Sequence, residues 1–311
     1  MVGEIIGLIK TIRIQQWIKN IAVFAAITFA GKLFDRQLFL DSLAVFIIFC
    51  GLSSATYIFN DLMDIKEDRC HPTKKYRPLP SGELRPITAV VGLVLIIFFS
   101  LSLASYFPAT FFFLCLLFLL LQFLYSTFLR RMVLLDVFLI AAGYVLRVLA
   151  GEFATGWHIS VWLLLCVISL SLFLAIGKRR AELTLLQKLG EKKIRSTLFH
   201  YPEKLLDIYT SMFANATWIT YSFYTFFAPI PRPQRRLGEF FSNIFPWGLE
   251  RKWMMTTIPV VMFAIMRYTH LIYEGERGET PEKVLLTDKP LIASVLIWCL
   301  MIIFVLYVLG G

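Results

Sequence analysis

Asn60–Gly82 reads N-D-L-M-D-I-K-E-D-R-C-H-P-T-K-K-Y-R-P-L-P-S-G and lies between two long apolar segments. If residues 60–68 continue the preceding helix, the 100° step per residue places Asp61, Asp64 and Asp68 within an arc of about 60°. Three carboxylates on one stripe repel each other, and a hard cation removes that conflict. An acidic helix end followed by a basic loop would explain the charges, but not their 3–4 spacing. The stretch therefore predicts a metal site.

The chemistry of this stretch favours Mg²⁺ in particular. Mg²⁺ takes oxygen ligands and is typically held by one or two carboxylates together with substrate phosphates. Lys74, Lys75 and Arg77 follow the aspartates and would bind the phosphate oxygens that the metal leaves free. Without a metal the stripe should be strained by its own charge, so exchanging one aspartate for asparagine should leave stability unchanged or raise it.

Composition places the chain in a membrane. It has 311 residues, 58% of them hydrophobic, and a mean hydropathy of +0.71. Repeated apolar runs of about 20 residues are each long enough to cross the hydrocarbon core as a helix. The net charge of +10 is explained by basic loops on the cytoplasmic side, so no nucleic-acid partner is predicted. The five cysteines are scattered without a C-x-x-C motif, which indicates structural thiols.

The apolar runs predict an all-α polytopic membrane protein with nine transmembrane helices. We expect one integral membrane domain over residues 1–311, with an amphipathic helix at residues 1–16 lying in the interface. The predicted spans are 18–34, 39–60, 87–105, 109–128, 132–154, 160–177, 205–228, 253–273 and 290–309.

The distribution of basic residues predicts the orientation. With the N-terminus inside, the inner segments hold 22 Lys and Arg residues and the outer segments hold seven. Residues 61–86, 178–204 and 274–289 are then cytoplasmic loops. The aspartate stripe faces the cytoplasm, where soluble phosphorylated metabolites are found.

Further groups of residues are candidates for a role in binding or catalysis. Gln16-Trp17-x-Lys19-Asn20 is either an interface anchor or a contact to a phosphate headgroup. In the fifth span, Arg147 shares a face with Asp136, Gly143 and Gly151. It is predicted either as a site residue or as part of a structural ion pair, because an arginine inside an apolar span must face a partner or a wet cavity.

The loop predicted after the sixth span carries Gly177-Lys178-Arg179-Arg180-Ala181-Glu182-Leu183, and residues 178–207 contain no D-x-x-x-D pair. The last inner loop is either solvated or supplies Glu274, Glu276, Glu279 and Glu282 as a lid over a metal–phosphate site. The chain contains no phosphate-binding Gly-rich loop and no H-E-x-x-H motif.

The motif N-D-x-x-D-x-x-x-D on the second of nine spans resembles the UbiA superfamily of intramembrane prenyltransferases. Finer motifs resemble one branch of it, the decaprenyl-phosphate phosphoribosyltransferases of arabinan precursor synthesis. The motifs that carry this closer resemblance are Gln16-Trp17-x-Lys19-Asn20, Asp68-x-x-His71-Pro72-Thr73-Lys74-x-x-Arg77-Pro78, Ala142-x-Tyr144-x-x-Arg147-x-x-Ala150-Gly151, Gly177-Lys178-Arg179-x-Ala181-Glu182-Leu183 and Arg267-Tyr268 with Gly278-Glu279. Arg180 and the position of Pro281 depart from the branch pattern, which leaves the specificity open.

This resemblance implies nine helices around a central cavity that is open to the cytoplasm and the lipid. It also implies a Mg²⁺-dependent glycosyltransferase of the plasma membrane. It implies 5-phosphoribosyl 1-diphosphate as donor, a polyprenyl phosphate as acceptor and diphosphate as product. Asn60, Asp61, Asp64 and Asp68 are then the metal ligands, and the three aspartates are catalytic. The substrate-binding residues are Lys19, Asn60, Lys74, Lys75, Arg77, Tyr144, Arg147, Lys178, Arg179 and Glu182.

Two other classes of protein remain to be weighed. A prenyltransferase acting on an aromatic or other acceptor usually has two Asp-rich motifs, and here Lys178, Arg179 and Glu182 stand where the second would be. A role as a transporter or a non-catalytic lipid-binding protein would not explain why three carboxylates are stacked on one helix face. The sequence leaves open the polyprenyl chain length, the number of Mg²⁺ ions and the oligomeric state, a homo-oligomer included.

Overall fold

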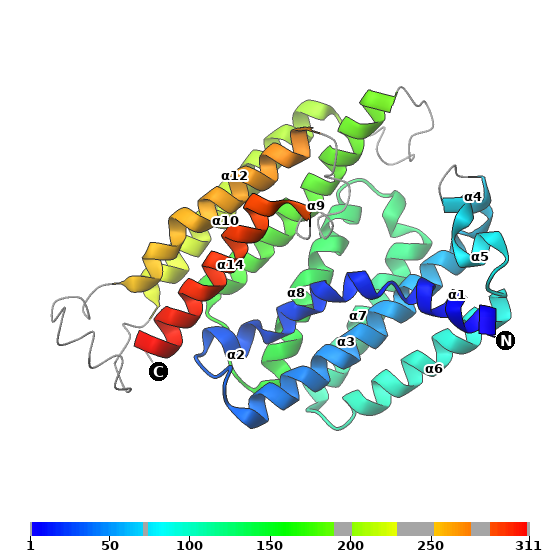
Figure 1. The fold of residues 1–311 in the computed structure, drawn as a ribbon, viewed down its shortest axis with the longest axis horizontal. Helices are drawn as coiled ribbons and strands as arrows, with labels where there is room; N and C mark the ends of the chain where they lie inside the picture. The colour runs from blue at the N-terminus through cyan, green and yellow to red at the C-terminus, as the bar shows by residue number, and fades with distance from the viewer. Residues whose placement is uncertain (1, 71–73, 190–200, 229–251, 275–286, 310–311) are drawn as a thin grey trace. The chain divides into compact units, whose positions relative to one another are not determined.

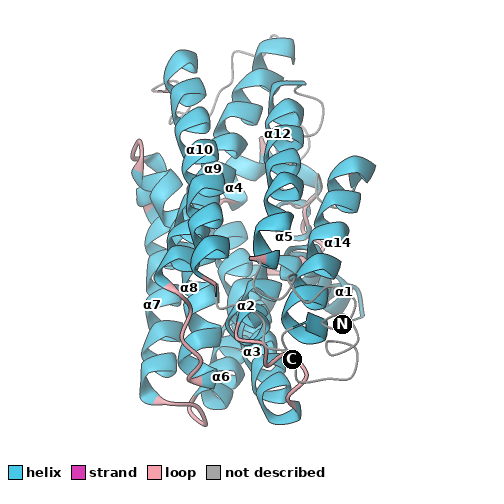
Figure 2. Ribbon diagram, turned by 90° about the vertical axis from the view of Figure 1, so that its left-hand side faces the viewer, coloured by secondary structure: helices cyan, strands magenta, loops and turns pink. Residues whose placement is uncertain are grey.

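The protein is described here from a computed structural model, which covers residues 2–70, 74–189, 201–228, 252–274 and 287–309. Within these ranges the chain is helical and contains no strand (Figures 1 and 2). The elements of the N-terminal half are α1 (Val2–Ile12), η1 (Ile14–Phe24), α2 (Ala25–Phe29), α3 (Arg36–Met63), α4 (Ile65–Arg69), η2 (Lys74–Tyr76), α5 (Pro78–Ser81), α6 (Pro86–Ala104), α7 (Ala109–Thr127), η3 (Leu129–Arg131) and α8 (Leu135–Thr155). Those of the C-terminal half are α9 (Val161–Leu189), α10 (Glu203–Phe227), η5 (Trp253–Thr257), α12 (Ile258–Glu274), α14 (Lys289–Ile303) and η6 (Phe304–Leu309).

The prediction of an all-α polytopic membrane protein is confirmed. Seven helices in the described ranges are long and apolar enough to cross a membrane, against nine predicted spans. They are Arg36–Met63, Pro86–Ala104, Ala109–Thr127, Leu135–Thr155, Val161–Thr184, Trp253–Glu274 and Lys289–Leu309.

The other two predicted spans differ for separate reasons. Residues 18–34 form the end of η1 and the short helix α2, so no single helix there is long enough. The predicted span 205–228 corresponds to α10, which is long enough but rich in hydroxyl side chains. Thr210, Thr217 and Thr220 each donate a hydrogen bond to the backbone carbonyl four residues earlier. Hydroxyls paired in this way lower the hydropathy of a helix without leaving polar groups unsatisfied.

Capping residues explain where the spans begin and end. The side chain of Asp35 accepts hydrogen bonds from the backbone N–H groups of Gln37 and Leu38, both at 3.1 Å, and so starts α3. Asp288 starts α14 in the same way by accepting from Leu291 N–H at 2.9 Å. Gly156, with φ of 71°, ends α8 in the left-handed conformation that glycine adopts at low cost.

The chain divides into two compact units. The first comprises residues Met1–Ile27, Leu33–Leu139 and Leu146–Trp157, and the second comprises Thr28–Lys32, Ile140–Val145 and His158–Gly311. In the first unit α3 packs against η1, α6 and α7, while α1 lies against α3, α5 and α6. In the second unit α9, α10 and α12 pack on one another, and α14 packs on α12 (Figure 1).

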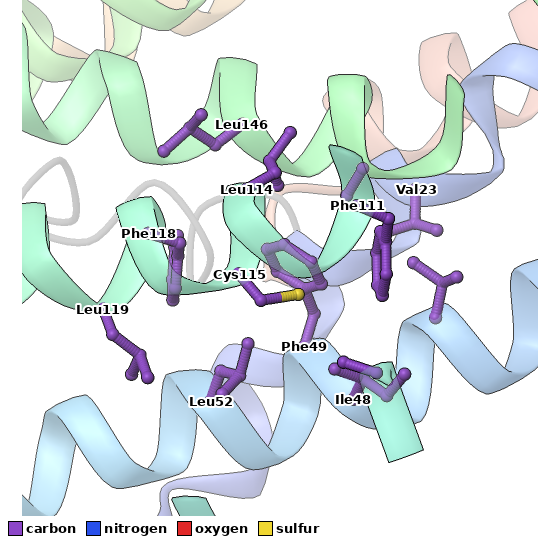
Figure 3. Close-up of a cluster of buried hydrophobic side chains, with 13 residues drawn as sticks. Val23, Ile48, Phe49, Leu52, Phe111, Leu114, Cys115, Phe118, Leu119 and Leu146 are labelled. Atoms are coloured by element: carbon purple, nitrogen blue, oxygen red, sulfur yellow. The ribbon is translucent and has the colours of Figure 1, made fainter. Parts of the chain in front are cut away.

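Each unit has its own apolar core. In the first unit the side chains of α3 and α7 meet around Phe49, whose ring lies 5.2 Å from that of Phe118 and 6.4 Å from that of Phe111 (Figure 3). In the second unit one buried cluster includes Tyr221 and Tyr224 of α10. Close-packed aromatic side chains are large contributors to the burial that holds helices together.

The predicted interfacial helix corresponds to α1, which ends at Ile12 rather than at residue 16. Ile5, Ile6 and Ile9 are exposed along it, as expected for a helix that lies in the membrane interface. Arg85 hydrogen-bonds Glu4, and Lys10 donates to Glu83 at 2.6 Å. The helix is therefore tied to the segment that leads into α6.

Candidate functional site

The aspartate stripe lies at the end of α3 and in the short helix α4. The spacing of the aspartates predicts one continuous helix over residues 60–68, whereas α3 ends at Met63 and α4 begins at Ile65, with Asp64 between them. The hydrogen-bond pattern nevertheless continues: Asp64 N–H donates to Asn60 O at 3.0 Å and Asp68 N–H donates to Asp64 O at 2.8 Å. The three aspartates remain one turn apart, and all three are buried.

Each of these carboxylates is paired with an arginine from another part of the first unit. Arg13, between α1 and η1, donates to Asp61 at 2.5 Å. Arg77, at the start of α5, donates to Asp61 at 3.2 Å and to Asp68 at 2.7 Å. Arg13 lies 48 residues from Asp61 in the sequence, so this pair forms only in the folded chain.

Arg130 of η3 makes the most complete of these pairs. Its two terminal nitrogens donate to the two oxygens of Asp64 at 2.7 and 2.6 Å, a bidentate arrangement. The side chain of Arg130 is 11% exposed, and its hydrogen bonds to Asp64 raise the pKa of the guanidinium. Asn60 adds a hydrogen bond from its amide nitrogen to Asp64 at 3.2 Å.

These ion pairs give the three aspartates a different charge balance from the one that the sequence predicts. Three carboxylates alone would repel each other, but three guanidinium groups balance them in the folded protein. Breaking one buried pair leaves an uncompensated buried charge, which typically costs about 3–5 kcal/mol. The three aspartates Asp61, Asp64 and Asp68 form the carboxylate stripe. Repulsion between their charges is therefore balanced in this structure.

Sequence reasoning assigned Arg77 to the site but missed Arg13 and Arg130. Both lie at the predicted inner ends of spans, where the positive-inside rule accounts for any arginine. Arg13 stands three residues before the Gln16-Trp17 motif, and that spacing was the one signal available for it. Nothing in the local sequence distinguishes Arg130 from its neighbour Arg131.

The lysines predicted to bind phosphate, and Tyr144, differ in exposure. Lys74 and Lys75 are exposed on η2, and the ammonium of Lys75 lies 5.1 Å from the centre of the Tyr76 ring. Lys19 is half-buried on η1, and Tyr144 is half-buried on α8. Exposed lysines on a short helix can move to meet a ligand at little cost.

Arg147 lies in the apolar interior of the first unit, where it binds two neutral side chains. Its Nε donates to Asn20 Oδ1 at 2.7 Å and its Nη2 donates to Ser53 Oγ at 3.1 Å. The guanidinium also lies 5.0 Å from the centre of the Phe118 ring. Asp136 and Gly143, which were predicted to share its face of α8, are buried as well.

The basic motif of the second unit lies on a helix and not in a loop. Residues 178–204 are predicted as a cytoplasmic loop, whereas α9 runs without a break to Leu189. Arg179 is buried and donates to Glu182 at 2.6 Å, one helical turn away, while Lys178 is half-buried. The reason is the run of good helix formers after Gly177, which continues the helix beyond the apolar segment.

Arg180, the residue that departs from the branch pattern, makes contacts of a different kind. It donates to Asp207 at 2.7 Å and to Glu203 at 2.6 Å, both on α10, and lies 4.8 Å from the centre of the Tyr273 ring. Arg180 thus joins α9 to α10 and α12 within the second unit.

The donor set of the stripe suits Mg²⁺ in chemical type. Carboxylate oxygens and the amide oxygen of Asn60 are hard ligands of the kind that this ion takes. Within the described ranges no three His, Cys, Asp or Glu side chains are gathered closely enough to hold a metal by themselves. Because Mg²⁺ usually keeps waters and takes phosphate oxygens, one or two of these aspartates are sufficient. The predicted glutamate lid lies, beyond Glu274, outside the described residues, as do His71, Pro72 and Thr73.

The fold and this carboxylate–arginine cluster define the class: an all-helical, multi-pass membrane protein with a charged site at the end of one span. It belongs to the UbiA prenyltransferase family, whose family model matches residues 21–182. The matched range includes the carboxylate stripe and ends at Glu182. The family resemblance read from the sequence is therefore confirmed.

Relatives within this family cover nearly the whole chain. A decaprenyl-phosphate phosphoribosyltransferase of Corynebacterium glutamicum is 33% identical over 97% of this chain and 87% of its own length. One of Mycolicibacterium smegmatis is 31% identical over 94% of this chain and 90% of its own length. The solved structure of a UbiA homologue from Archaeoglobus fulgidus bound to DMAPP and Mg²⁺ superposes with a TM-score of 0.67. The two chains are 19% identical, and the match covers 96% of this chain and 98% of the other. At this identity the likeness is one of fold.

Proposed function

We propose that this protein transfers the 5-phosphoribosyl group from 5-phosphoribosyl 1-diphosphate to a polyprenyl phosphate and releases diphosphate. The observation that carries the proposal is the similarity, over nearly the full length of both chains, to two decaprenyl-phosphate phosphoribosyltransferases. The site adds a chemical argument, because its arginines and lysines suit a donor and an acceptor that are both phosphates. The product would serve arabinan and cell-wall precursor synthesis.

Mg²⁺ fits the carboxylate stripe, and Asn60, Asp61, Asp64 and Asp68 are the residues that would hold it. When bound, the ion would offset the charge that develops on the departing diphosphate. With the carboxylates engaged by an ion, Arg13, Arg77 and Arg130 would be available to phosphate oxygens, for which the planar guanidinium is well suited.

The acceptor needs no general base. A phosphate monoester has a second pKa of about 6, so at pH 7 it is largely a dianion and is already a nucleophile. Its oxygen forms a bond to C1 of the ribose while the bond from C1 to the diphosphate oxygen breaks, through an oxocarbenium-like state. The protein's contribution is then orientation and charge balance, from Arg13, Arg77 and Arg130 and from the predicted contacts Lys19, Lys74, Lys75, Tyr144, Lys178, Arg179 and Glu182.

A second candidate function is prenyl transfer from a prenyl diphosphate. The family match favours it at a coarse level, and the Archaeoglobus fulgidus homologue is bound to such a donor together with Mg²⁺. Against it stands the motif on α9, which has Lys178, Arg179 and Glu182 and no second pair of aspartates. A cation-rich motif suits phosphate groups better than a second cluster of metal ions.

The donor is tested by giving purified protein and Mg²⁺ either 5-phosphoribosyl 1-diphosphate with a polyprenyl phosphate, or a prenyl diphosphate with an aromatic acceptor. We expect mass spectrometry to detect a lipid product heavier by one phosphoribosyl group in the first mixture alone. A product heavier by one prenyl group in the second mixture, with none in the first, would overturn the assignment. No product in either mixture, from protein that binds neither donor, would favour a non-catalytic role.

We further propose that the protein lies in the plasma membrane with the carboxylate stripe on the cytoplasmic side. The excess of basic residues in the predicted inner segments supports this orientation. Tyr76, exposed by 74%, and Glu191 are suitable positions for single cysteines once the exposed Cys70 is replaced by serine. Impermeant maleimide should label Tyr76→Cys and Glu191→Cys only after the cells are opened. Labelling of both in intact cells would reverse the topology.

A further inference from the structure

The segment η1 has an unusual conformation for its length. It is a 3₁₀ helix of 11 residues, whereas such helices rarely exceed three or four residues because their hydrogen-bond geometry is poor. It begins directly after Arg13, whose backbone is in the left-handed region with φ of 55° and ψ of 59°. A segment of this kind needs contacts from the rest of the fold to keep its shape.

Helix α3 supplies one set of these contacts. Trp17 Nε1 donates to Ser54 Oγ at 3.1 Å, and Ser54 Oγ in turn donates to the backbone oxygen of Cys50 at 2.7 Å. Asn20 is fully buried; its amide nitrogen donates to Cys50 Sγ at 3.3 Å, and its oxygen accepts from Ser53 Oγ at 3.3 Å. The side chains of Trp17 and Asn20 therefore both hydrogen-bond to α3.

Helix α8 supplies the other set. Arg147, itself 6% exposed, donates to Asn20 Oδ1 and Ser53 Oγ and so joins the polar contacts on both elements. One turn further along α8, Gly151 lies against the backbone of Val23, where any Cβ would overlap the carbonyl oxygen. The absence of a side chain at Gly151 is what lets α8 come close enough for Arg147 to reach η1.

We propose that Arg147 and Asn20 are positioning residues, which fix η1 so that Lys19 is presented to a substrate phosphate. Adjacent residues of a 3₁₀ helix point about 120° apart, so holding Asn20 inward sets the direction of Lys19. A buried arginine is a costly way to join two helices, since apolar residues would do so with less desolvation. What the guanidinium adds is a rigid fork that fixes the directions of its hydrogen bonds. The role of Lys19 rests on the function proposed above.

A structural measurement tests the positioning without using the activity. Lys19→Cys is introduced into protein that lacks the accessible Cys70 and Cys299; the remaining Cys50, Cys115 and Cys166 are buried. We expect Arg147→Met to change the alkylation rate of the cysteine at position 19 by about tenfold or more, and Asn20→Leu to do the same. Asn20→Asp keeps the acceptor for Arg147 and should restore a rate within about threefold of the parent.

The matched control is Arg180→Met, which removes a buried arginine of the second unit that pairs with Glu203 and Asp207. It should lower the melting temperature as much as Arg147→Met does, but leave alkylation at position 19 unchanged. Equal alkylation rates in the parent and in Arg147→Met would overturn the proposal. So would an effect of the same size from Arg180→Met, because it would reflect general loosening.

A double-mutant cycle tests whether the positioning acts through Lys19. Arg147→Met should lower kcat/KM for the phosphoribosyl donor about 10- to 100-fold in the parent, and by less than about twofold when Lys19 is already alanine. Equal losses in both backgrounds would overturn the proposal, since Arg147 would then act independently of Lys19. If the parent transfers no phosphoribosyl group, the proposed function fails. The cycle is then run with the prenyl donor, and the alkylation test still decides the positioning.

Discussion

Asp64→Asn lowers phosphoribosyl transfer by about 100-fold or more, as the loss of one preorganised charged group in an active site commonly does. Asparagine keeps the shape of the side chain but removes the negative charge that a metal–diphosphate complex needs. The measurement is the initial rate at saturating Mg²⁺ with both substrates. Near-normal turnover under those conditions would show that Asp64 is not a metal ligand.

The same substitution should also lower stability in Mg²⁺-free buffer. Arg130 makes two hydrogen bonds to Asp64 and is largely buried, so the variant removes the charge of its bidentate partner, while Glu67 stays more distant at 3.9 Å. We expect a loss of about 3–5 kcal/mol, the typical cost of breaking one buried ion pair. This reverses the expectation from sequence, where like-charge repulsion alone suggested unchanged or higher stability. Thermal unfolding in detergent, followed with and without Mg²⁺, measures it.

Asp41→Asn is the matched control for both effects. Asp41 lies near the other end of α3 and accepts a hydrogen bond only one turn away, from Gln37 at 3.0 Å. The same chemical change there should alter neither the transfer rate nor the melting temperature by a measurable amount. A comparable loss of activity in Asp41→Asn would mean that charge on α3 in general, and not the stripe, is responsible.

What the sequence predicted well depends on local periodicity. The apolar runs predicted the helical membrane fold, and the 3–4 spacing of the aspartates predicted that Asp61, Asp64 and Asp68 lie together. Both follow from the geometry of one helix, which a single segment of sequence contains. The stripe stayed together even though α3 ends within it, because the backbone hydrogen bonds continue through Asp64.

What the sequence did not predict depends on pairing between distant segments. Arg13 and Arg130 lie 48 and 66 residues from the aspartates they bind. The positive-inside rule accounts for a basic residue at each of these positions just as well as an ion pair does. The 3₁₀ form of η1 is likewise set by α3 and α8, since its own residues would also suit an α-helix. Arg147 illustrates the same limit, because its partners Asn20 and Ser53 are neutral and carry no signal of pairing.

Arg179→Ala should lower kcat/KM for 5-phosphoribosyl 1-diphosphate by about 10- to 150-fold, which corresponds to the loss of about 1.5–3 kcal/mol from hydrogen bonds to a charged group. We expect Lys178→Ala to have an effect of the same order. Arg179 is buried and paired with Glu182, and a guanidinium held in one orientation is suited to bind a phosphate group. Steady-state rates with varied donor measure both variants.

Substitution of the neighbouring Arg180 shows whether an arginine on α9 binds the donor or only stabilises the fold. Its guanidinium is engaged by Glu203 and Asp207, so Arg180→Ala should lower the melting temperature while leaving KM for the donor within about twofold. Arg179→Ala should instead raise KM for the donor about tenfold or more, whatever its effect on the melting temperature, because of these two arginines only Arg179 is assigned to the substrate. Neither variant should gain transfer from a prenyl diphosphate. If Arg179→Ala and Arg180→Ala lower stability alike and leave donor KM alike, the basic motif on α9 supports the helix packing of the second unit and does not bind the donor.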